Sequence, residues 1–167
     1  MSRSSTDCVI GLGSNLGDRA EVLRRSVAEL GALGEVIAIS ALYETEPVGP
    51  PQPTYLNAAV RLLTQLDLQE LLEELLAIER RFGRQRRERW GARILDLDIL
   101  WASGGVFETE KLRVPHPRLN ERAFALLPLL DVAPEASDPR SNEPYVLVLE
   151  RCTPAGAREL ARLWTRT

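Results

Sequence analysis

The sequence predicts one layered α/β domain in which strands and helices follow the order β-α-β-β-α-β. Two segments carry apolar residues at helical spacing, and short β-rich segments precede, separate and follow them. The chain has 167 residues, of which 44% are hydrophobic and 27% charged. Such a chain can bury a substantial core as a single domain, which we expect to span residues 1–167.

The first strand and the first helix are predicted at the start of the chain. Residues 8–11 form the strand, and the glycine-rich stretch GLGSNLGD, residues 11–18, is predicted to be a loop. Asp18, with Glu21 three residues later, is typical of a helix start. The apolar residues that follow at helical spacing form one face of this helix.

A proline-rich loop separates the second and third predicted strands. Residues 35–43 form the second strand, the loop of residues 44–54 contains four prolines, and residues 55–63 alternate in the way a third strand does. Asp67 starts the second helix, whose leucines are spaced for burial. Residues 94–101 form the fourth strand.

Shorter elements are predicted beyond the fourth strand. Residues 106–114 are expected to hold one or two short strands, and residues 123–132 form a helix that is interrupted at Pro128. The tail indicates a strand at residues 145–149 and a final helix at residues 154–167, with a threonine as its N-cap. The complete order is that of a ferredoxin-like α/β sandwich with C-terminal additions.

Charge and composition narrow the class of ligand. The net charge is −3, yet seven of the twenty arginines lie within residues 80–93. A local cationic group on an acidic molecule favours a small anionic ligand over nucleic acid. Two cysteines far apart in sequence indicate neither a disulfide framework nor a zinc site.

The sequence shows no targeting or membrane-spanning segment. The N-terminus has no apolar segment long enough for a signal peptide, and no run in the chain approaches the length of a bilayer span. We therefore expect a cytoplasmic protein that does not bind a membrane. We also expect it to be a monomer that does not bind nucleic acid.

The segment GRQRRERWGARILDLDIL, residues 83–100, is the most informative part of the chain. Side chains alternate along a strand, so Asp96 and Asp98 are predicted to lie side by side on one face. The opposite face is expected to enter the core through Leu95, Leu97, Ile99 and Trp101. Two adjacent carboxylates in an apolar strand need a cation, although a solvated strand face is the alternative. Oxygen ligands favour magnesium, and two ions sharing the carboxylates fit phosphoryl-type chemistry.

Five arginines and a tryptophan lead into this acidic strand: Arg84, Arg86, Arg87, Arg89, Arg93 and Trp90. Guanidinium groups pair with phosphate oxygens in bidentate fashion. A loop at residues 84–90, tethered beside the carboxylates, is placed to close over a metal-bound polyphosphate, while the alternative is a solvated surface loop. The two features together predict an ATP-dependent transfer enzyme.

Three further features are compatible with this interpretation and with ordinary structural roles. The glycine loop lacks the Lys-Ser/Thr ending of a Walker A motif and is weak evidence of phosphate binding. Tyr55 and Asn57 share a strand face where they could stack on and hydrogen-bond a flat heterocycle, or simply form a polar surface. His116, near several arginines, suits phosphate binding or a structural position.

Five motifs taken together resemble one known family, that of 6-hydroxymethyl-7,8-dihydropterin pyrophosphokinase. They are GLGSNLGD (11–18), Y-x-T-x-P-x-G-P (43–50), YLNAAV (55–60), RWGARILDLDIL (89–100) and VPHPRLNERAF (114–124). The resemblance extends over residues 9–134. It implies a ferredoxin-like fold and transfer of the β,γ-diphosphoryl group of ATP to the hydroxymethyl oxygen of the pterin, with release of AMP. It also implies a place in folate biosynthesis, where dihydropteroate synthase takes the product.

The resemblance implies a role for individual residues of this chain. Asp96 and Asp98 match the ligands of two magnesium ions, and with Arg84 and Arg93 they form the catalytic set. The implied pterin contacts are Thr45, Val48, Tyr55, Asn57, Trp90 and Phe124. The implied ATP contacts are Glu79, Arg86, Trp90, Arg93, Ile99, Lys111, His116 and Arg122. The loop at residues 84–90 is one residue shorter than in some relatives, which leaves its lid role open between Arg86 and Arg87.

The mechanism expected from these residues is positioning and charge neutralisation. No residue stands out as a strong general base, so we expect metal polarisation to activate the hydroxyl. Two other interpretations are compatible with the sequence. A nucleotidyltransferase or two-metal polymerase-type enzyme would release diphosphate instead of AMP, and an RNA-binding module would use the arginines but is disfavoured by the negative net charge.

Overall fold

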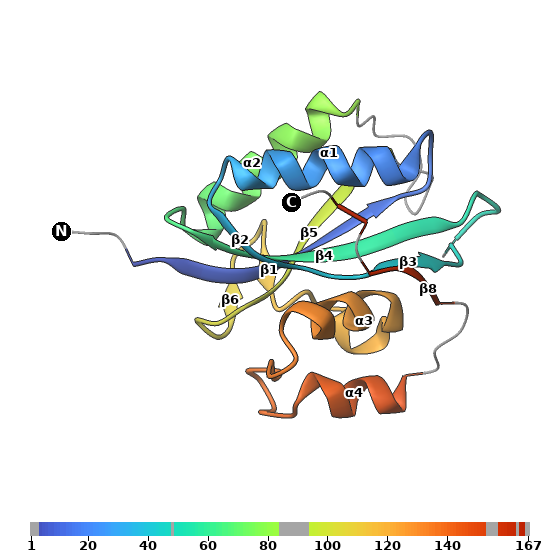
Figure 1. Ribbon diagram of the computed structural model, residues 1–167. Coiled ribbons are helices and arrows are strands. Elements are labelled where there is room, and N and C mark those ends of the chain that lie inside the picture. Colours follow the sequence, from blue (N-terminus) through green and yellow to red (C-terminus); the bar gives the residue numbers. More distant parts are fainter. Residues whose placement is uncertain (1–3, 48, 84–93, 153–156, 163, 166–167) are drawn as a thin grey trace.

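A six-stranded sheet lies between two layers of helices in the computed structural model (Figure 1). The structure describes residues 4–47, 49–83, 94–152, 157–162 and 164–165. Helices α1 (Arg19–Gly31) and α2 (Leu68–Arg81) cover one face of the sheet, while α3 (Ala123–Val132) covers the other and α4 (Tyr145–Arg151) lies outside α3.

The sheet is antiparallel and its strand order is β5-β1-β4-β3-β8, with β2 also paired to β4. The strands are β1 (Thr6–Ser14), β2 (Glu35–Ile39), β3 (Leu42–Thr45), β4 (Tyr55–Thr64), β5 (Asp96–Ala102) and β8 (Arg158–Ala161). A separate two-stranded sheet joins β6 (Phe107–Glu108) to β7 (Arg113–Val114), and a 3₁₀ turn, Leu119–Glu121, precedes α3. No helix in the described ranges is both long and apolar enough to cross a membrane.

Two apolar cores, one on each face of the sheet, hold these layers together. The α1/α2 side buries leucines and isoleucines of both helices and of alternate strand positions, among them Ile10, Leu23, Leu71 and Ile78. The α3/α4 side buries a second cluster that includes Val9, Leu126, Leu129 and Tyr145. Because β1 contributes to both clusters, residues 8–13 carry no charged or hydroxyl side chain, as expected for the middle of a central strand.

The predicted starts of the first two helices are confirmed. The Asp18 side chain accepts a hydrogen bond from the Glu21 backbone N–H at 3.2 Å, and Asp67 accepts one from Glu70 at 2.8 Å. Each cap satisfies a backbone donor that the first helical turn leaves without an intrahelical partner. The strand predicted at residues 55–63 is also confirmed, since β4 extends it by one residue.

The predicted second strand is in fact two strands, separated at Ser40. The Ser40 hydroxyl accepts from the Ala59 N–H at 2.8 Å, and the Ser40 carbonyl accepts from the Trp164 indole N–H at 2.8 Å. The serine therefore replaces regular ladder bonds with side-chain and long-range bonds, which divides residues 35–43 into β2 and β3.

The glycine-rich stretch differs from the loop that its sequence predicts from residue 11, because β1 continues to Ser14. Gly11 pairs with Ala59 and Asp98, and Gly13 pairs with Asn57 and Asp96. Strands β4 and β5 hydrogen-bond to the backbone of this segment on its two sides, and this pairing outweighs the preference of glycine for turns.

The prediction that Trp101 shares a face with Leu97 and Ile99 is wrong. The β1–β5 register shifts between Val9, which pairs with Trp101, and Ile10, which pairs with Ile99. This bulge at Leu100 moves the Trp101 side chain to the α3/α4 core, where its indole N–H donates to the Ser137 carbonyl at 3.1 Å. One inserted residue changes the face that later side chains occupy.

The predicted interruption of helix α3 at Pro128 does not occur, since the helix continues through this residue to Val132. Apart from Asp131 its residues are apolar, since the helix lies between the sheet and α4 (Figure 1). Burial on two sides compensates for the hydrogen bond that the proline cannot donate.

The two C-terminal predictions are reversed. Residues 145–149 belong to helix α4, in which Tyr145 and Val148 are buried while Val146 and Leu147 are exposed, a spacing of three residues instead of two. In the predicted final helix, the described residues 158–161 form strand β8, paired with β3. Its predicted start at residues 153–154 lies outside the described residues.

Candidate active site

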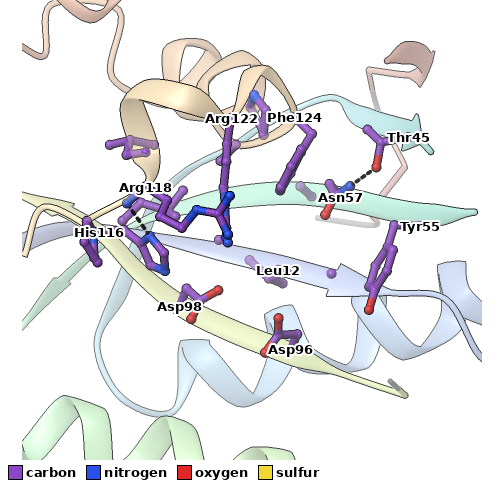
Figure 2. A pocket seen from close by; sticks show the side chains of 18 of the residues that line it. Leu12, Thr45, Tyr55, Asn57, Asp96, Asp98, His116, Arg118, Arg122 and Phe124 are labelled. Atoms are coloured by element: carbon purple, nitrogen blue, oxygen red, sulfur yellow. Dashed lines mark hydrogen bonds between the residues drawn. The ribbon is translucent and has the colours of Figure 1, made fainter. Parts of the chain in front are cut away.

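A cavity of about 330 Å³ opens on the α3 side of the sheet (Figure 2). Strands β1, β4 and β5 form its floor, and residues 116–128 form the opposite wall. Figure 2 shows the side chains of Asp96 and Asp98 directed into the same space as those of Arg122 and Phe124. The structure thus brings together residues from segments that are far apart in the sequence.

Asp96 and Asp98 lie side by side on the cavity face of β5, as the alternation predicts. Both are partly buried. Each pairs with a glycine of the neighbouring strand β1: Asp96 with Gly13, and Asp98 with Gly11. The glycines leave no side chains on the central strand here, so the two carboxylates border an open space.

Gly11 and Gly13 are site residues that sequence reasoning missed. Their sequence indicates a turn, although their two-residue spacing within an apolar segment could have indicated one face of a strand. An added Cβ at Gly13 would lie 3.1 Å from the Asn57 Oδ1 atom, and one at Gly11 would lie 3.0 Å from a Leu100 methyl carbon. The absence of side chains at these positions therefore leaves room for Leu100 and Asn57, both of which line the cavity.

Four predicted pterin contacts line the other end of the cavity: Thr45, Tyr55, Asn57 and Phe124. The Asn57 amide donates to the Thr45 hydroxyl at 2.5 Å, which orients the amide (Figure 2). Thr45 and Tyr55 are paired residues of β3 and β4. Two aromatic rings, an oriented amide and a flat floor form a site suited to a planar, hydrogen-bonding heterocycle.

A cationic group, Arg118 and Arg122, faces the two carboxylates. His116, Arg118 and Arg122 line the cavity, and the His116 Nδ1 atom accepts the Arg118 backbone N–H at 3.2 Å. Burial, together with the charges of Arg122 and Arg118, lowers the pKa of His116 to about 4, so the imidazole is neutral at neutral pH. Burial also lowers the pKa of Arg122, while the charges of Asp98 and Asp96 oppose that effect. Arg122 is thus close enough to interact with both aspartates.

A second hollow of about 420 Å³ adjoins the first. Asp98, His116 and Pro117 line both hollows, so they meet at these residues. The second hollow is lined by two further predicted ATP contacts, Ile99 and Lys111. One ligand could therefore place its reactive end beside Asp98 while its body occupies the second hollow.

Glu79, another predicted ATP contact, is placed differently. It is 1% exposed, and its Oε2 atom accepts the Leu97 backbone N–H at 2.9 Å. Leu97 is the residue between the two aspartates, in the edge strand of the sheet. In this structure Glu79 holds β5 in place at the point where the two carboxylates project.

Five predicted site residues lie outside the described residues: Val48, Arg84, Arg86, Trp90 and Arg93. The same holds for Arg87 and for the predicted closing loop at residues 84–90.

The carboxylate pair fits magnesium that arrives with a substrate. Among the described residues, no group of three or more His, Cys, Asp or Glu side chains is arranged to hold a metal ion. Magnesium keeps several of its waters and commonly binds through one or two carboxylates plus substrate phosphates, not in an all-protein cage. Asp96 and Asp98 provide such a partial ligand set beside the cationic group that would bind phosphate.

Comparison with known proteins agrees with this geometry. The family described as 7,8-dihydro-6-hydroxymethylpterin-pyrophosphokinase (HPPK) matches residues 9–134. A 2-amino-4-hydroxy-6-hydroxymethyldihydropteridine pyrophosphokinase of Synechocystis is 42% identical over 149 residues, which cover 87% of this chain and 76% of that protein. The Bacillus subtilis protein of the same name is 49% identical over 126 residues, covering 74% and 75% of the two chains.

Solved structures show the same fold. A Plasmodium falciparum HPPK-DHPS structure matches with a TM-score of 0.69 at 16% identity, over 89% of this chain. The present chain spans 46% of that longer chain. The family match and the relatives together decide among the three interpretations of the sequence: this chain belongs to the HPPK family and is a pyrophosphokinase of 6-hydroxymethyldihydropterin in folate biosynthesis.

Proposed function

We propose that this chain binds the pterin in the first cavity and ATP in the second hollow, and transfers the β,γ-diphosphoryl group where the two meet. The observation that carries this proposal is the sharing of Asp98 and His116 by both hollows. An acceptor hydroxyl in one hollow and a triphosphate in the other would meet at the carboxylates and cations.

The pterin end of the site is proposed to consist of Thr45, Tyr55, Asn57 and Phe124. The hydrogen bond between Asn57 and Thr45 supports this assignment, because an oriented amide can recognise a heterocycle edge without losing further side-chain entropy on binding. Phe124 lies beside Arg122, whose guanidinium carbon is 5.5 Å from the ring centre. Val48 and Trp90 are proposed as the remaining pterin contacts from the family resemblance.

Asp96 and Asp98 are proposed to hold two magnesium ions carried by ATP. Bound magnesium would neutralise phosphate charge and polarise the phosphate oxygens. The spacing of the two aspartates on one strand face, and the partly buried Arg122 opposite them, support this assignment.

The phosphates of ATP are proposed to contact His116 and Arg122, while Ile99 and Lys111 border the nucleotide. Arg84, Arg86 and Arg93 are proposed to contact the phosphates on the basis of the resemblance. Glu79 is proposed to act near the nucleotide through β5, since its carboxylate accepts the Leu97 N–H.

In the reaction, the pterin hydroxymethyl oxygen attacks the β-phosphorus of ATP and forms a new P–O bond. The bond between that phosphorus and the oxygen bridging it to the α-phosphate breaks, AMP leaves with the bridging oxygen, and the hydroxyl proton is released. The chain contributes in-line positioning of the two substrates and charge neutralisation, which dominate catalysis of phosphoryl transfer.

We further propose that residues 1–167 form one domain of ferredoxin-like topology, which the strand order β5-β1-β4-β3 supports. The protein is proposed to be a cytoplasmic monomer that binds neither membrane nor nucleic acid. Its product is proposed to pass to dihydropteroate synthase. The joined name HPPK-DHPS of the Plasmodium falciparum neighbours supports this last proposal.

The test is an incubation with ATP, Mg²⁺ and 6-hydroxymethyl-7,8-dihydropterin in which the nucleotide products are separated. AMP that forms only when the pterin is present supports the proposal. Formation of ADP, or of AMP independently of the pterin, contradicts it.

A further inference from the structure

We propose that Arg19 is a positioning residue that links Glu44 to Thr54 across the proline-rich loop at residues 46–54 and thereby sets the geometry of the pterin end of the site. The inference rests on the proposed function, because it assigns the pterin to the cavity beside this loop. Arg19 is the first residue of α1, which begins at the same end of the sheet as the loop (Figure 1). It is not a cavity-lining residue.

The Arg19 guanidinium bridges Glu44, near the end of β3, and Thr54, the last residue of the loop. Its Nη1 atom donates to the Thr54 carbonyl at 2.8 Å and to the Thr54 hydroxyl at 2.9 Å. Its Nη2 atom donates to a carboxylate oxygen of Glu44 at 3.2 Å. A planar guanidinium can make these three bonds at once, whereas a lysine ammonium of similar length offers no such fork.

Each residue that Arg19 binds is next in sequence to a cavity residue. Glu44 precedes Thr45 and Thr54 precedes Tyr55, and Thr45 and Tyr55 are paired across β3 and β4. Thr45 in turn orients the amide of Asn57. A shift at either end of the loop therefore reaches the groups that would contact the pterin.

The buried Asn15 amide also binds the loop, donating to the Gln52 Oε1 atom at 2.8 Å and to the Pro53 carbonyl at 3.1 Å, but neither bond reaches Glu44. Four prolines remove backbone donors along the loop. The Arg19 and Glu44 side chains are 27% and 26% exposed, so their interaction is partly shielded from water and salt. The other Glu44 carboxylate oxygen accepts from Arg158 of β8 at 3.2 Å, but the Arg158 side chain is 72% exposed. Arg158 is consequently the weaker partner.

The test compares Arg19→Gln and Arg19→Lys with the matched control Arg158→Gln, which removes the other cation of Glu44. We measure kcat, the KM values for pterin and for ATP, and the melting temperature of each variant. For Arg19→Gln we expect the pterin KM to rise about 10- to 50-fold, with the ATP KM within about twofold of wild type, since misplacement of binding groups by about 1 Å has effects of this size. Arg19→Lys should lie between Arg19→Gln and wild type, and Arg158→Gln should match wild type.

A purely structural role would lower the melting temperature and leave both KM values unchanged, and that result would overturn the proposal. An equal rise in both KM values would overturn it as well. If Arg19→Gln fails to fold, Glu44→Gln provides the same comparison, because it weakens the bridge without removing the helix residue. Failure of the proposed function would be visible separately, as a wild-type protein that forms no pterin-dependent AMP.

Discussion

Gly13→Ala tests whether the missing side chains of β1 create the pterin site. Gly13 lies on the cavity face of β1, between Asn57 of β4 and Asp96 of β5. The added methyl carbon would be 3.1 Å from the Asn57 Oδ1 atom and 3.5 Å from the nearest Tyr55 ring carbon. The first distance is shorter than an ordinary van der Waals contact, so Asn57 must move.

The size of the effect depends on how freely Asn57 can move. Its amide is hydrogen-bonded to the Thr45 hydroxyl at 2.5 Å, so displacement or rotation of the amide disturbs that bond. Inserting a methyl group into a well-packed region costs about 1–3 kcal/mol. Part of this cost falls on the free protein, because Asn57 must shift there too, and the displaced amide then binds the ligand less well. We therefore expect about 10- to 100-fold weaker pterin binding, together with a modest fall in the melting temperature.

The assay measures the pterin KM at saturating ATP, the ATP KM, and the melting temperature. Gly31→Ala is the matched control, because an added Cβ at the end of α1 meets no heavy atom within 4 Å. Gly13→Ala should raise the pterin KM and leave the ATP KM within about twofold, whereas Gly31→Ala should change neither. A Gly13→Ala enzyme with wild-type pterin KM and kcat would refute the reasoning that the open face of β1 forms the pterin site.

Three further predictions concern the metal ligands, the histidine and a helix cap. Asp98→Ala should lower kcat by about 1,000-fold or more, because losing the charge stabilisation by the metal costs several kcal/mol. The circular dichroism spectrum of the variant should match that of wild type. Retained turnover in saturating Mg²⁺ would exclude the metal assignment. Because burial and the charges of Arg122 and Arg118 lower the His116 pKa from 6.5 to about 4, the unfolded chain binds a proton that the native state does not as the pH falls from 6.5 to 4. The free energy of unfolding should thus decrease as the pH falls over this interval. Between pH 7 and pH 5 it should decrease by about 1–2 kcal/mol more in wild type than in His116→Asn. Urea titrations that give wild type and variant the same pH dependence would contradict this. Asp67→Ala removes the cap bond to the Glu70 N–H and should cost about 1 kcal/mol of stability by the same titration, while an unchanged midpoint would mean that the cap contributes nothing.

Local sequence patterns predict the fold correctly where interactions between residues close in sequence determine the structure. The starts of α1 and α2 follow from Asp18 and Asp67, whose side chains bond the backbone three residues later. Strand β4 and the common face of Asp96 and Asp98 follow from a two-residue alternation that the backbone imposes. The carboxylate pair of the candidate site is therefore predictable from sequence alone.

Errors arise where distant segments compete for the same backbone groups. Residues 11–14 resemble a turn in isolation, but β4 and β5 pair with them on both sides. Residues 158–161 form β8, which pairs with β3, and the Trp164 indole N–H donates to the Ser40 carbonyl, more than a hundred residues earlier in the chain. No local propensity contains this information, because the partners are specified by the sheet and not by the neighbouring sequence.

The sequence shows all the residue types that the chemistry needs. They are two carboxylates, a histidine and arginines near an aromatic and an amide. Their arrangement is not evident there, since it depends on the glycine face of β1, on the bulge at Leu100 and on the packing of α3 over the sheet. The linear pattern thus specifies which groups are present and which strand face carries them. Long-range pairing and packing specify the distances between those groups, because the chain must fold before segments a hundred residues apart can enclose one cavity.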